Sequence, residues 1–152
     1  MTHFNRREFL AGAAGLVAGG LMGQAGRASA QVKAKPGGRD LLGVVGVEND
    51  FIPGGALPVK EGDQIVPLIN SIAAKFTHVI LTQDWHTPGH TSFASAHGGK
   101  KPFETVTLVY GTQVLWPDHC VQGTPGADFH RDLKIPHAEL IIRKGYRQHM
   151  DS

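Results

Sequence analysis

The chain has 152 residues, a length that allows one globular domain at most. Hydrophobic residues make up 41% of it, enough for an ordinary core, and the formal net charge is only +2 with 18% charged residues. Lys and Arg do not cluster with aromatic residues, so nucleic acid is not an expected partner. The single cysteine, Cys120, excludes a disulfide bond within these residues.

Residues 1–30 have the composition of an export signal. The pair Arg6-Arg7 precedes an apolar stretch rich in Ala and Gly, and Ala28-Ser29-Ala30 offers an A-x-A cleavage site. This pattern resembles a twin-arginine signal. The apolar run of about 14 residues is shorter than the roughly 20 that a membrane-spanning helix needs, so we expect no stable membrane anchor. We therefore expect a periplasmic protein whose mature chain begins near Gln31.

Beyond a polar linker at residues 31–40, one domain is expected over residues 41–152. Residues 41–47 are a continuous apolar run, typical of a strand buried on both faces. A helix is predicted next, then a second strand, a long loop and a third strand, at residues 63–76, 77–82, 83–102 and 138–143. Two further segments, 108–115 and 120–129, are expected to be mostly connections with one short helix. The order predicts an α/β fold, a parallel sheet flanked by helices.

Metal-binding residue types follow the predicted second strand. Asp84 and His86 are two residues apart, which directs both side chains the same way on an extended segment. His119, in a turn-rich segment, is a candidate third ligand. One oxygen and two nitrogens with open positions suit a catalytic divalent metal, although each histidine has a surface or core role as its alternative. Since ligands bind outside the carboxyl ends of parallel strands, the segment 48–51 and Lys144 are expected at the same edge.

Several blocks of sequence carry recognisable motifs in chain order: Val47–Leu57, Gln83–His86, His90–Ala94, Tyr110-Gly111, Leu115–Phe129 and Arg143–Gly145. Together they resemble the nicotinamidase (pyrazinamidase) branch of the isochorismatase-like hydrolases. The resemblance runs from about Leu41 to Ser152, and residues 116–126 are its most specific part. It implies a Rossmann-like parallel sheet flanked by helices, of which this chain carries the N-terminal portion. It also implies hydrolysis of nicotinamide, a small aromatic amide, to nicotinate and ammonia by a Cys–Lys–Asp triad beside a divalent metal.

The resemblance assigns roles to particular positions. It implies metal ligands at Asp84, His86 and His119, for a Zn, Fe or Mn ion. His90 either joins these ligands or hydrogen-bonds to the site. The resemblance further implies a triad lysine at Lys144, whose ammonium favours a thiolate.

The substrate ring has two implied neighbours. Phe51 and Trp116 match the aromatic residues that flank the pyridine ring, with ordinary core packing as the alternative. Asp50 matches another aspartate of the family, with a structural role.

Two features depart from the family pattern. Gly46 occupies the position of the triad aspartate, and Glu48 replaces the usual glutamine. Glu48 faces the same side of the strand but lies ~6.6 Å further along it, so we do not assume that it substitutes. The triad cysteine is expected beyond Ser152, and Cys120 is expected to be a small buried residue beside the metal loop. We therefore expect no turnover by the isolated chain, and a fold that is marginal, aggregation-prone or dependent on a partner.

Three interpretations follow. The chain is part of a periplasmic nicotinamidase-like hydrolase, a non-catalytic metal- or pyridine-binding protein, or one half of a split enzyme completed by a complementary chain. Gly46 favours the second interpretation, and an adjacent reading frame that carries the cysteine motif would favour the third. The sequence leaves a homo-oligomer open.

Overall fold

The computed structural model describes residues 35–151, so the predicted export signal and residues 31–34 of the predicted linker lie outside the described residues. The main elements are β1 (Leu41–Val44), α1 (Ile65–Ala73), β2 (His78–Asp84), β3 (Thr105–Leu108), β4 (Gly111–Val114) and β5 (Leu140–Lys144). Short 3-10 turns lie at Asn49–Phe51, Gly62–Gln64, Ala94–Ala96 and Pro125–Ala127. Within this range, no helix is both long and apolar enough to cross a membrane.

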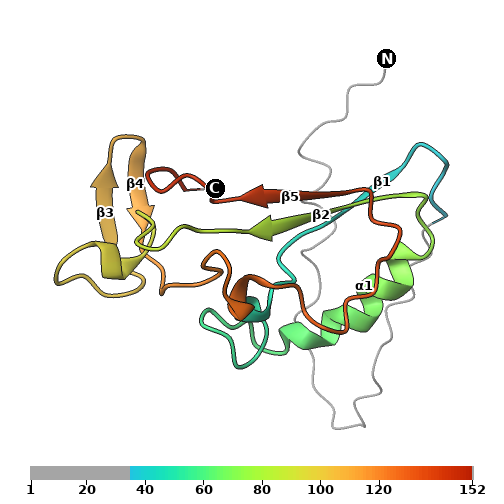
Figure 1. Cartoon of the computed structure of the whole chain (residues 1–152), viewed down its shortest axis with the longest axis horizontal. Helices are drawn as coiled ribbons and strands as arrows, with labels where there is room; N and C mark the ends of the chain where they lie inside the picture. Colours follow the sequence, from blue (N-terminus) through green and yellow to red (C-terminus); the bar gives the residue numbers. More distant parts are fainter. Residues whose placement is uncertain (1–34, 152) are drawn as a thin grey trace, which may run out of the picture. The chain divides into compact units, whose positions relative to one another are not determined.

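A parallel sheet with the strand order β1-β2-β5 forms the centre of the fold. Leu41 pairs with His78 at one end, and Asp84 pairs with Lys144 at the other. The helix α1 lies on one side of this sheet, and the arrowheads of β2 and β5 point toward the β3–β4 hairpin (Figure 1). The predicted α/β fold with a parallel sheet is confirmed.

The helix α1 covers the sheet through one apolar stripe. Val66 and Ala73 are buried and join a core cluster that includes Val44, Val79 and Leu81. Because Val66, Ile69 and Ala73 follow at spacings of three and four, they share one face of the helix. Proline at position 67 is tolerated because it falls in the first helical turn, where its missing N–H has no intrahelical acceptor.

The expectation of a first strand buried on both faces is wrong. The strand β1 ends at Val44, and its burial alternates, with Leu41 exposed and Val44 buried. The chain then turns at Gly46, whose φ of +74° lies in the left-handed region. Burial alternates because the core cluster, including α1, packs on only one face of β1.

The β3–β4 hairpin was not predicted, because the segment 108–115 was expected to be a connection. The two strands pair antiparallel around Val109 and Tyr110, two residues that are poor signals for a tight turn. Gly111 supplies the positive φ, +128°, directly after them. The hairpin is tied to the end of the described chain, where the Nε2 of Gln113 donates to the Oδ2 of Asp151 at 2.8 Å.

Candidate metal and ring-binding site

Two predicted metal ligands, Asp84 and His86, lie together where β2 ends. Both side chains are buried, and the Nε2 of His86 lies 3.5 Å from the Oδ2 of Asp84. The spacing of two places both on the same side of the extended segment, as expected from the geometry of a strand.

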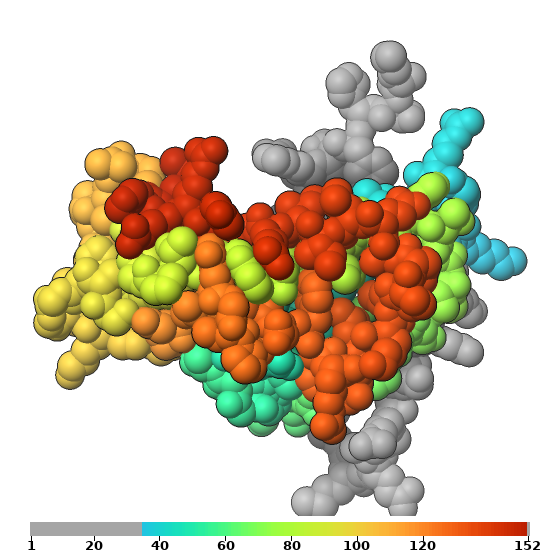
Figure 2. All heavy atoms as spheres, viewed as in Figure 1, coloured from blue at the N-terminus to red at the C-terminus, as the bar shows by residue number. Residues whose placement is uncertain are grey.

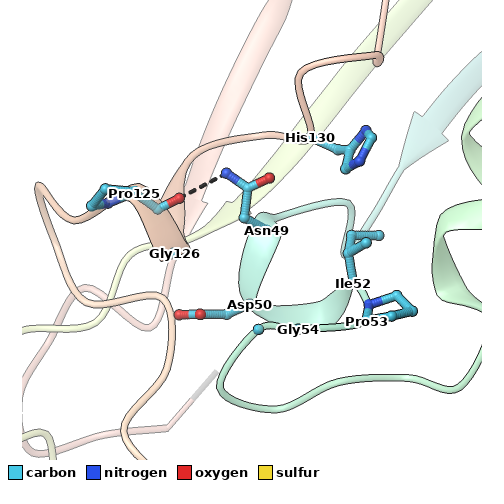
Figure 3. Close-up of a pocket in the computed structure, with 9 residues that line it drawn as sticks. Asn49, Asp50, Ile52, Pro53, Gly54, Pro125, Gly126 and His130 are labelled. Atoms are coloured by element: carbon cyan, nitrogen blue, oxygen red, sulfur yellow. Dashed lines mark hydrogen bonds between the residues drawn. The ribbon is translucent and has the colours of Figure 1, made fainter.

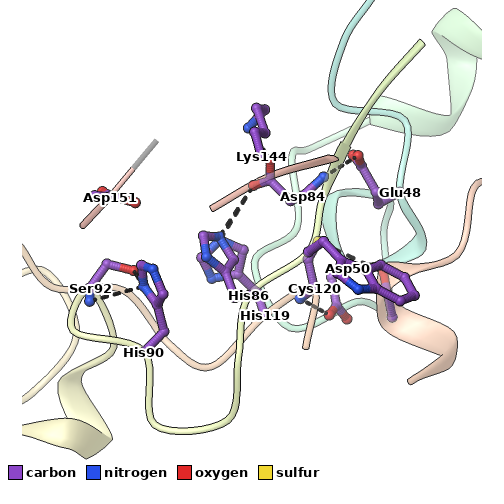
Figure 4. Close-up of polar contacts among 12 residues, drawn as sticks. Glu48, Asp50, Asp84, His86, His90, Ser92, His119, Cys120, Lys144 and Asp151 are labelled. Carbon is purple, nitrogen blue, oxygen red and sulfur yellow. Dashed lines mark hydrogen bonds and ion pairs between the residues drawn. The ribbon is translucent and has the colours of Figure 1, made fainter. Parts of the chain in front are cut away.

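The third predicted ligand, His119, reaches the same place from the loop at residues 116–122. This loop continues the sheet hydrogen bonding: the N–H of His86 donates to the carbonyl of Cys120 at 3.0 Å, and the N–H of Gln122 donates to the carbonyl of His86 at 2.8 Å. The Nε2 of His119 lies 3.9 Å from the Oδ2 of Asp84. One ligand atom from each of the three side chains lies within 4.8 Å of the others, and Figure 4 shows the two imidazoles beside Asp84.

The protonation of the two histidines suits metal binding. Burial lowers the pKa of His86 and of His119, which favours the neutral imidazoles that metals need. The Nδ1 of His119 hydrogen-bonds to the carbonyl of Pro117 at 2.8 Å, so this nitrogen carries the proton and Nε2 keeps its lone pair. A carboxylate with two neutral imidazoles can hold Zn, Fe or Mn, so the residues present fit a divalent metal.

His90 is fully buried beside this cluster and is hydrogen-bonded at both ring nitrogens. Its Nδ1 lies 2.7 Å from the Oγ of Ser92, and its Nε2 lies 3.0 Å from the carbonyl oxygen of Arg147. The bond to Arg147 connects the loop after β2 to the segment after β5. His90 also lies with His86 and Asp151 in a second group whose ligand atoms are within 4.8 Å of one another.

Phe93 was not predicted as a site residue, yet it supports the histidines. Its ring is fully buried, and its centroid lies 5.3 Å from that of His86, 5.4 Å from that of His119 and 5.6 Å from that of His90. A sequence signal existed, because Phe93 lies in one of the motif blocks, but an apolar residue there does not by itself indicate contact with three imidazoles.

Lys144 reaches the metal ligands through the strand register. It is paired with Asp84 across β2 and β5, and its Nζ forms an ion pair with the Oδ1 of Asp84. Burial lowers the pKa of Lys144, while Glu48 and Asp151 oppose that effect. The two oxygens of Asp84 therefore face different groups: Oδ1 faces the ammonium and Oδ2 faces the imidazoles.

Glu48 contacts Asp84 and is fully buried. Its Oε1 accepts a hydrogen bond from the backbone N–H of Asp84 at 2.8 Å, whereas its Oε2 has no hydrogen-bond partner among the described residues. Burial raises the pKa of Glu48 to about 7, although a backbone hydrogen bond, Lys144 and His86 act in the opposite direction. Gly46 has open space where a Cβ would lie, so no neighbouring atom fills the position of the family's triad aspartate.

A pocket of about 270 Å³ is lined by both the predicted metal ligands and the predicted ring-binding residues. Phe51, Leu57 and Trp116 contribute apolar walls, and the three metal-ligand candidates, Lys144 and Asp151 contribute polar ones. Phe51 and His119 lie 5.6 Å apart by ring centroids. Leu57 and Asp151 were not predicted to line this pocket. The structure thus brings the predicted ring and lysine positions into one pocket with Asp84, His86 and His119, whereas His90 does not line it.

Cys120 is fully buried, as expected, at a backbone φ of +45°. Burial raises the pKa of its thiol, and Glu48 and Asp50 add to the effect. Its N–H donates to the Oδ2 of Asp50 at 2.7 Å, while the Oδ1 of Asp50 accepts from the N–H of Ala56 at 3.1 Å. Asp50 therefore ties two loops together, and Cys120 is not placed as a nucleophile.

A second cavity, of about 370 Å³, lies beside the 3-10 turn at Asn49–Phe51 (Figure 3). It is lined by Asn49, Asp50, Ile52 and His130, among others, and the side chain of Asn49 closes one wall by donating to the carbonyl of Pro125 at 2.8 Å. Both carboxylate oxygens of Asp50 are engaged by backbone N–H groups. The polar residues that line this cavity therefore serve to connect loops.

Comparison with known proteins identifies relatives of this chain. The chain is 51% identical over 122 residues to a nicotinamidase of Acinetobacter baylyi, an alignment that covers 80% of this chain and 57% of the relative. A solved nicotinamidase/pyrazinamidase of Acinetobacter baumanii superimposes with a TM-score of 0.73 at 59% identity, covering 74% of this chain and 54% of that one. A pyrazinamidase of Pyrococcus horikoshii in complex with zinc superimposes with a TM-score of 0.58 at 38% identity, covering 74% and 55%. No family model matches the chain.

These findings confirm the predicted relationship: the chain is a relative of the nicotinamidase branch of the isochorismatase-like hydrolases. It spans about half the length of the relatives that it matches.

Proposed function

We propose that residues 41–151 form the metal- and ring-binding part of a nicotinamidase-type hydrolase, which converts nicotinamide and water to nicotinate and ammonia. One observation carries this proposal: the cluster of Asp84, His86 and His119 shares a single pocket with Phe51, Trp116 and Lys144. The names of the relatives supply the class of substrate.

The side chains of the pocket suit separate tasks. Neutral His86 and His119, with Asp84, would hold one divalent ion, which supplies a Lewis acid to hold the substrate. Phe51 and Trp116 offer aromatic surface for the pyridine ring. The ammonium of Lys144 would stabilise a neighbouring thiolate or another negative charge. That thiolate is not Cys120, because Cys120 is buried and its pKa is raised.

Binding of zinc and nicotinamide by the purified chain tests the proposal. We expect about one Zn²⁺ per chain after dialysis, and quenching of tryptophan fluorescence on addition of nicotinamide. Trp116→Phe should abolish the quenching, whereas Trp85→Phe should retain it, because the ring of Trp85 packs under the guanidinium of Arg143 instead of lining the pocket. Absence of zinc from wild-type protein would contradict the proposal.

A non-catalytic binding protein is the second candidate, and Gly46 together with the buried Cys120 favours it. In either case we expect the chain alone, supplied with Zn²⁺, Fe²⁺ or Mn²⁺, to release no ammonia from nicotinamide. Addition of the segment of the Acinetobacter baylyi relative that this chain does not span separates the two candidates. Activity of the mixture, with Gly46→Asp in place, indicates a part of an enzyme, whereas continued inactivity indicates a binding protein.

We also propose that residues 1–30 direct export to the periplasm. The support is the adjacent Arg6-Arg7 pair, the short apolar stretch and the A-x-A site. A reporter fused after residue 40 should be exported by bacteria, and replacement of both arginines by lysine should block that export. Export that is unaffected by the replacement would contradict a twin-arginine route.

A further inference from the structure

Gly145 lies directly against a predicted metal ligand. It follows β5, where the N–H of Trp85 donates to the carbonyl of Lys144 at 2.9 Å and so continues the pairing of β2 with β5. This register places the backbone of Gly145 beside the imidazole of His86. The close-up of the site shows His86 below the end of the strand that carries Lys144 (Figure 4).

A side chain at position 145 would collide with His86. A Cβ built on Gly145 would lie closer than 3.0 Å to two atoms of the imidazole, Cε1 and Nδ1, a separation that real Cβ atoms essentially never show. The imidazole has little room to retreat, because the ring centroids of His90, His119 and Phe93 lie 4.5, 4.9 and 5.3 Å from its own.

Gly145 also has a positive φ of +65°, but that property alone does not distinguish it. Gly99 has a φ of +77° and open space where its Cβ would lie. Gly99 therefore needs glycine for its backbone alone, whereas Gly145 needs glycine for its backbone and for the space that His86 occupies.

The environment of the two ring nitrogens of His86 agrees with a positioning role for Gly145. The Nδ1 of His86 is buried without a hydrogen-bond partner among the described residues, while Nε2 faces Asp84. The backbone of Gly145 lies against this side of the ring, next to Cε1 and Nδ1. Metal-binding histidines commonly present their second nitrogen to a backbone carbonyl, which fixes the orientation of the ring.

We propose that Gly145 is a positioning residue of the metal centre: its bare backbone sets the imidazole of His86 so that Nε2 faces Asp84 and His119. The proposal rests on the proposed metal site. It assigns to this glycine an effect on metal affinity, which the need for a positive φ alone would not produce.

Zinc affinity of the full chain gives the first test. Gly145→Ala should weaken Zn²⁺ binding at least about tenfold in competition with a chromophoric chelator, since displacing a supporting group of a metal ligand commonly costs 10–100-fold. It should also change the visible absorption spectrum of the Co²⁺-loaded protein. Gly99→Ala introduces a similar backbone strain away from the site and should keep zinc affinity within about twofold of wild type. Equal affinities of the two variants would overturn the proposal.

A stability cycle gives the second test and does not depend on metal. In urea unfolding of metal-free protein, Gly145→Ala should lower the midpoint more than Gly99→Ala does. In the His86→Ala background, where no ring opposes the new methyl group, the two alanines should lower it equally. If Gly145→Ala does not fold, then His86→Ala/Gly145→Ala should fold as well as His86→Ala/Gly99→Ala. An excess cost of Gly145→Ala that persists without the ring would contradict the contact.

The two tests separate the possible failures. Wild-type protein that binds no zinc refutes the proposed metal site, whereas the stability cycle still decides whether Gly145 sets the position of His86. Zinc binding by wild type and by Gly145→Ala with equal affinity refutes the positioning role and leaves the metal site intact.

Discussion

Two regions of the sheet reverse the usual pattern of a globular protein, in which polar side chains are exposed and apolar ones are buried. Polar side chains are buried at the end of the sheet that carries the site, and apolar side chains are exposed on the outer strand β5. At the site, Glu48, His86 and His90 are almost completely buried. On β5, Leu140 and Ile141 are 52% and 51% exposed, and atoms of this part of the chain lie on the visible surface in Figure 2. Burial of a polar group costs free energy unless hydrogen bonds or ligands satisfy it, and contiguous exposed apolar groups mark surfaces that pack against something else.

The two regions differ in how well the described residues cover them. Loops that follow β2, β4 and β5 enclose the site with hydrogen bonds and rings. By contrast, no described strand pairs with the outer edge of β5, and its apolar side chains stay exposed. We therefore expect the uncovered edge at β5, and not the site, to be the weak point of the folded chain.

Loss of a metal ligand should have the largest effect. His119→Ala removes one of three donors and should weaken Zn²⁺ binding by more than about 100-fold, measured as metal content after dialysis and by chelator competition. His78→Ala is the control, because His78 is half-exposed and pairs with Glu139 away from the cluster. Unchanged metal content in His119→Ala would show that the three-ligand assignment is wrong.

The exposed strand should limit the stability of the sheet. We expect the purified chain, cleaved after residue 30, to aggregate or to melt without a cooperative transition above ~50 °C. Ile141→Lys should slow aggregation, because a charge on an edge strand opposes edge-to-edge association. Val109→Lys, on the fully exposed turn of the β3–β4 hairpin, should have a smaller effect. A cooperative transition above ~50 °C would contradict this view of β5.

Glu48 should make stability depend on pH. Its pKa in the folded chain is about 7, above the usual 4.5, so the folded state binds the proton more tightly than the unfolded state. Its contribution is therefore full below pH 4.5 and is lost as pH rises to about 7. Glu48→Gln should leave stability unchanged near pH 4 and increase it by about 1–3 kcal/mol at pH 8, in urea unfolding of metal-free protein.

The lowered pKa values of His86 and His119 act in the opposite direction, since they remove stability as pH falls below 6.5. The difference between Glu48→Gln and wild type isolates the carboxyl group from this effect. A difference that does not change between pH 4 and pH 8 would show that Glu48 is not a buried carboxyl with a raised pKa.

The smallest expected effect is that of restoring the family's aspartate. Gly46→Asp places a side chain at a φ of +74°, which should cost about 1 kcal/mol of unfolding free energy despite the open space around it. Urea unfolding at pH 7 measures this cost, and Gly123→Asp, at a φ of +73° with similar space, provides the matched control. A gain in stability would show that the aspartate finds a favourable partner, such as Lys144.

Much of the site could be predicted from sequence because its signals are local. The spacing of Asp84 and His86 fixes their common direction, and His119 lies in a motif that is specific on its own. Leu57 and Asp151 carry no such signal, since their place in the pocket depends on how distant loops fold back. The hairpin at residues 105–114 was missed because its turn residues, Val109 and Tyr110, do not mark a turn.

Sequence alone therefore determined the α/β class, the parallel strands, the family relationship and most of the side chains that the structure gathers in one pocket, because these depend on periodicity and short motifs. Only the tertiary structure decided that Lys144 pairs with Asp84, that Glu48 accepts a hydrogen bond from the backbone N–H of Asp84, and that Gly145 leaves space for His86. Each of these contacts joins residues tens of positions apart, and the strand register that brings them together depends on the packing of the whole sheet.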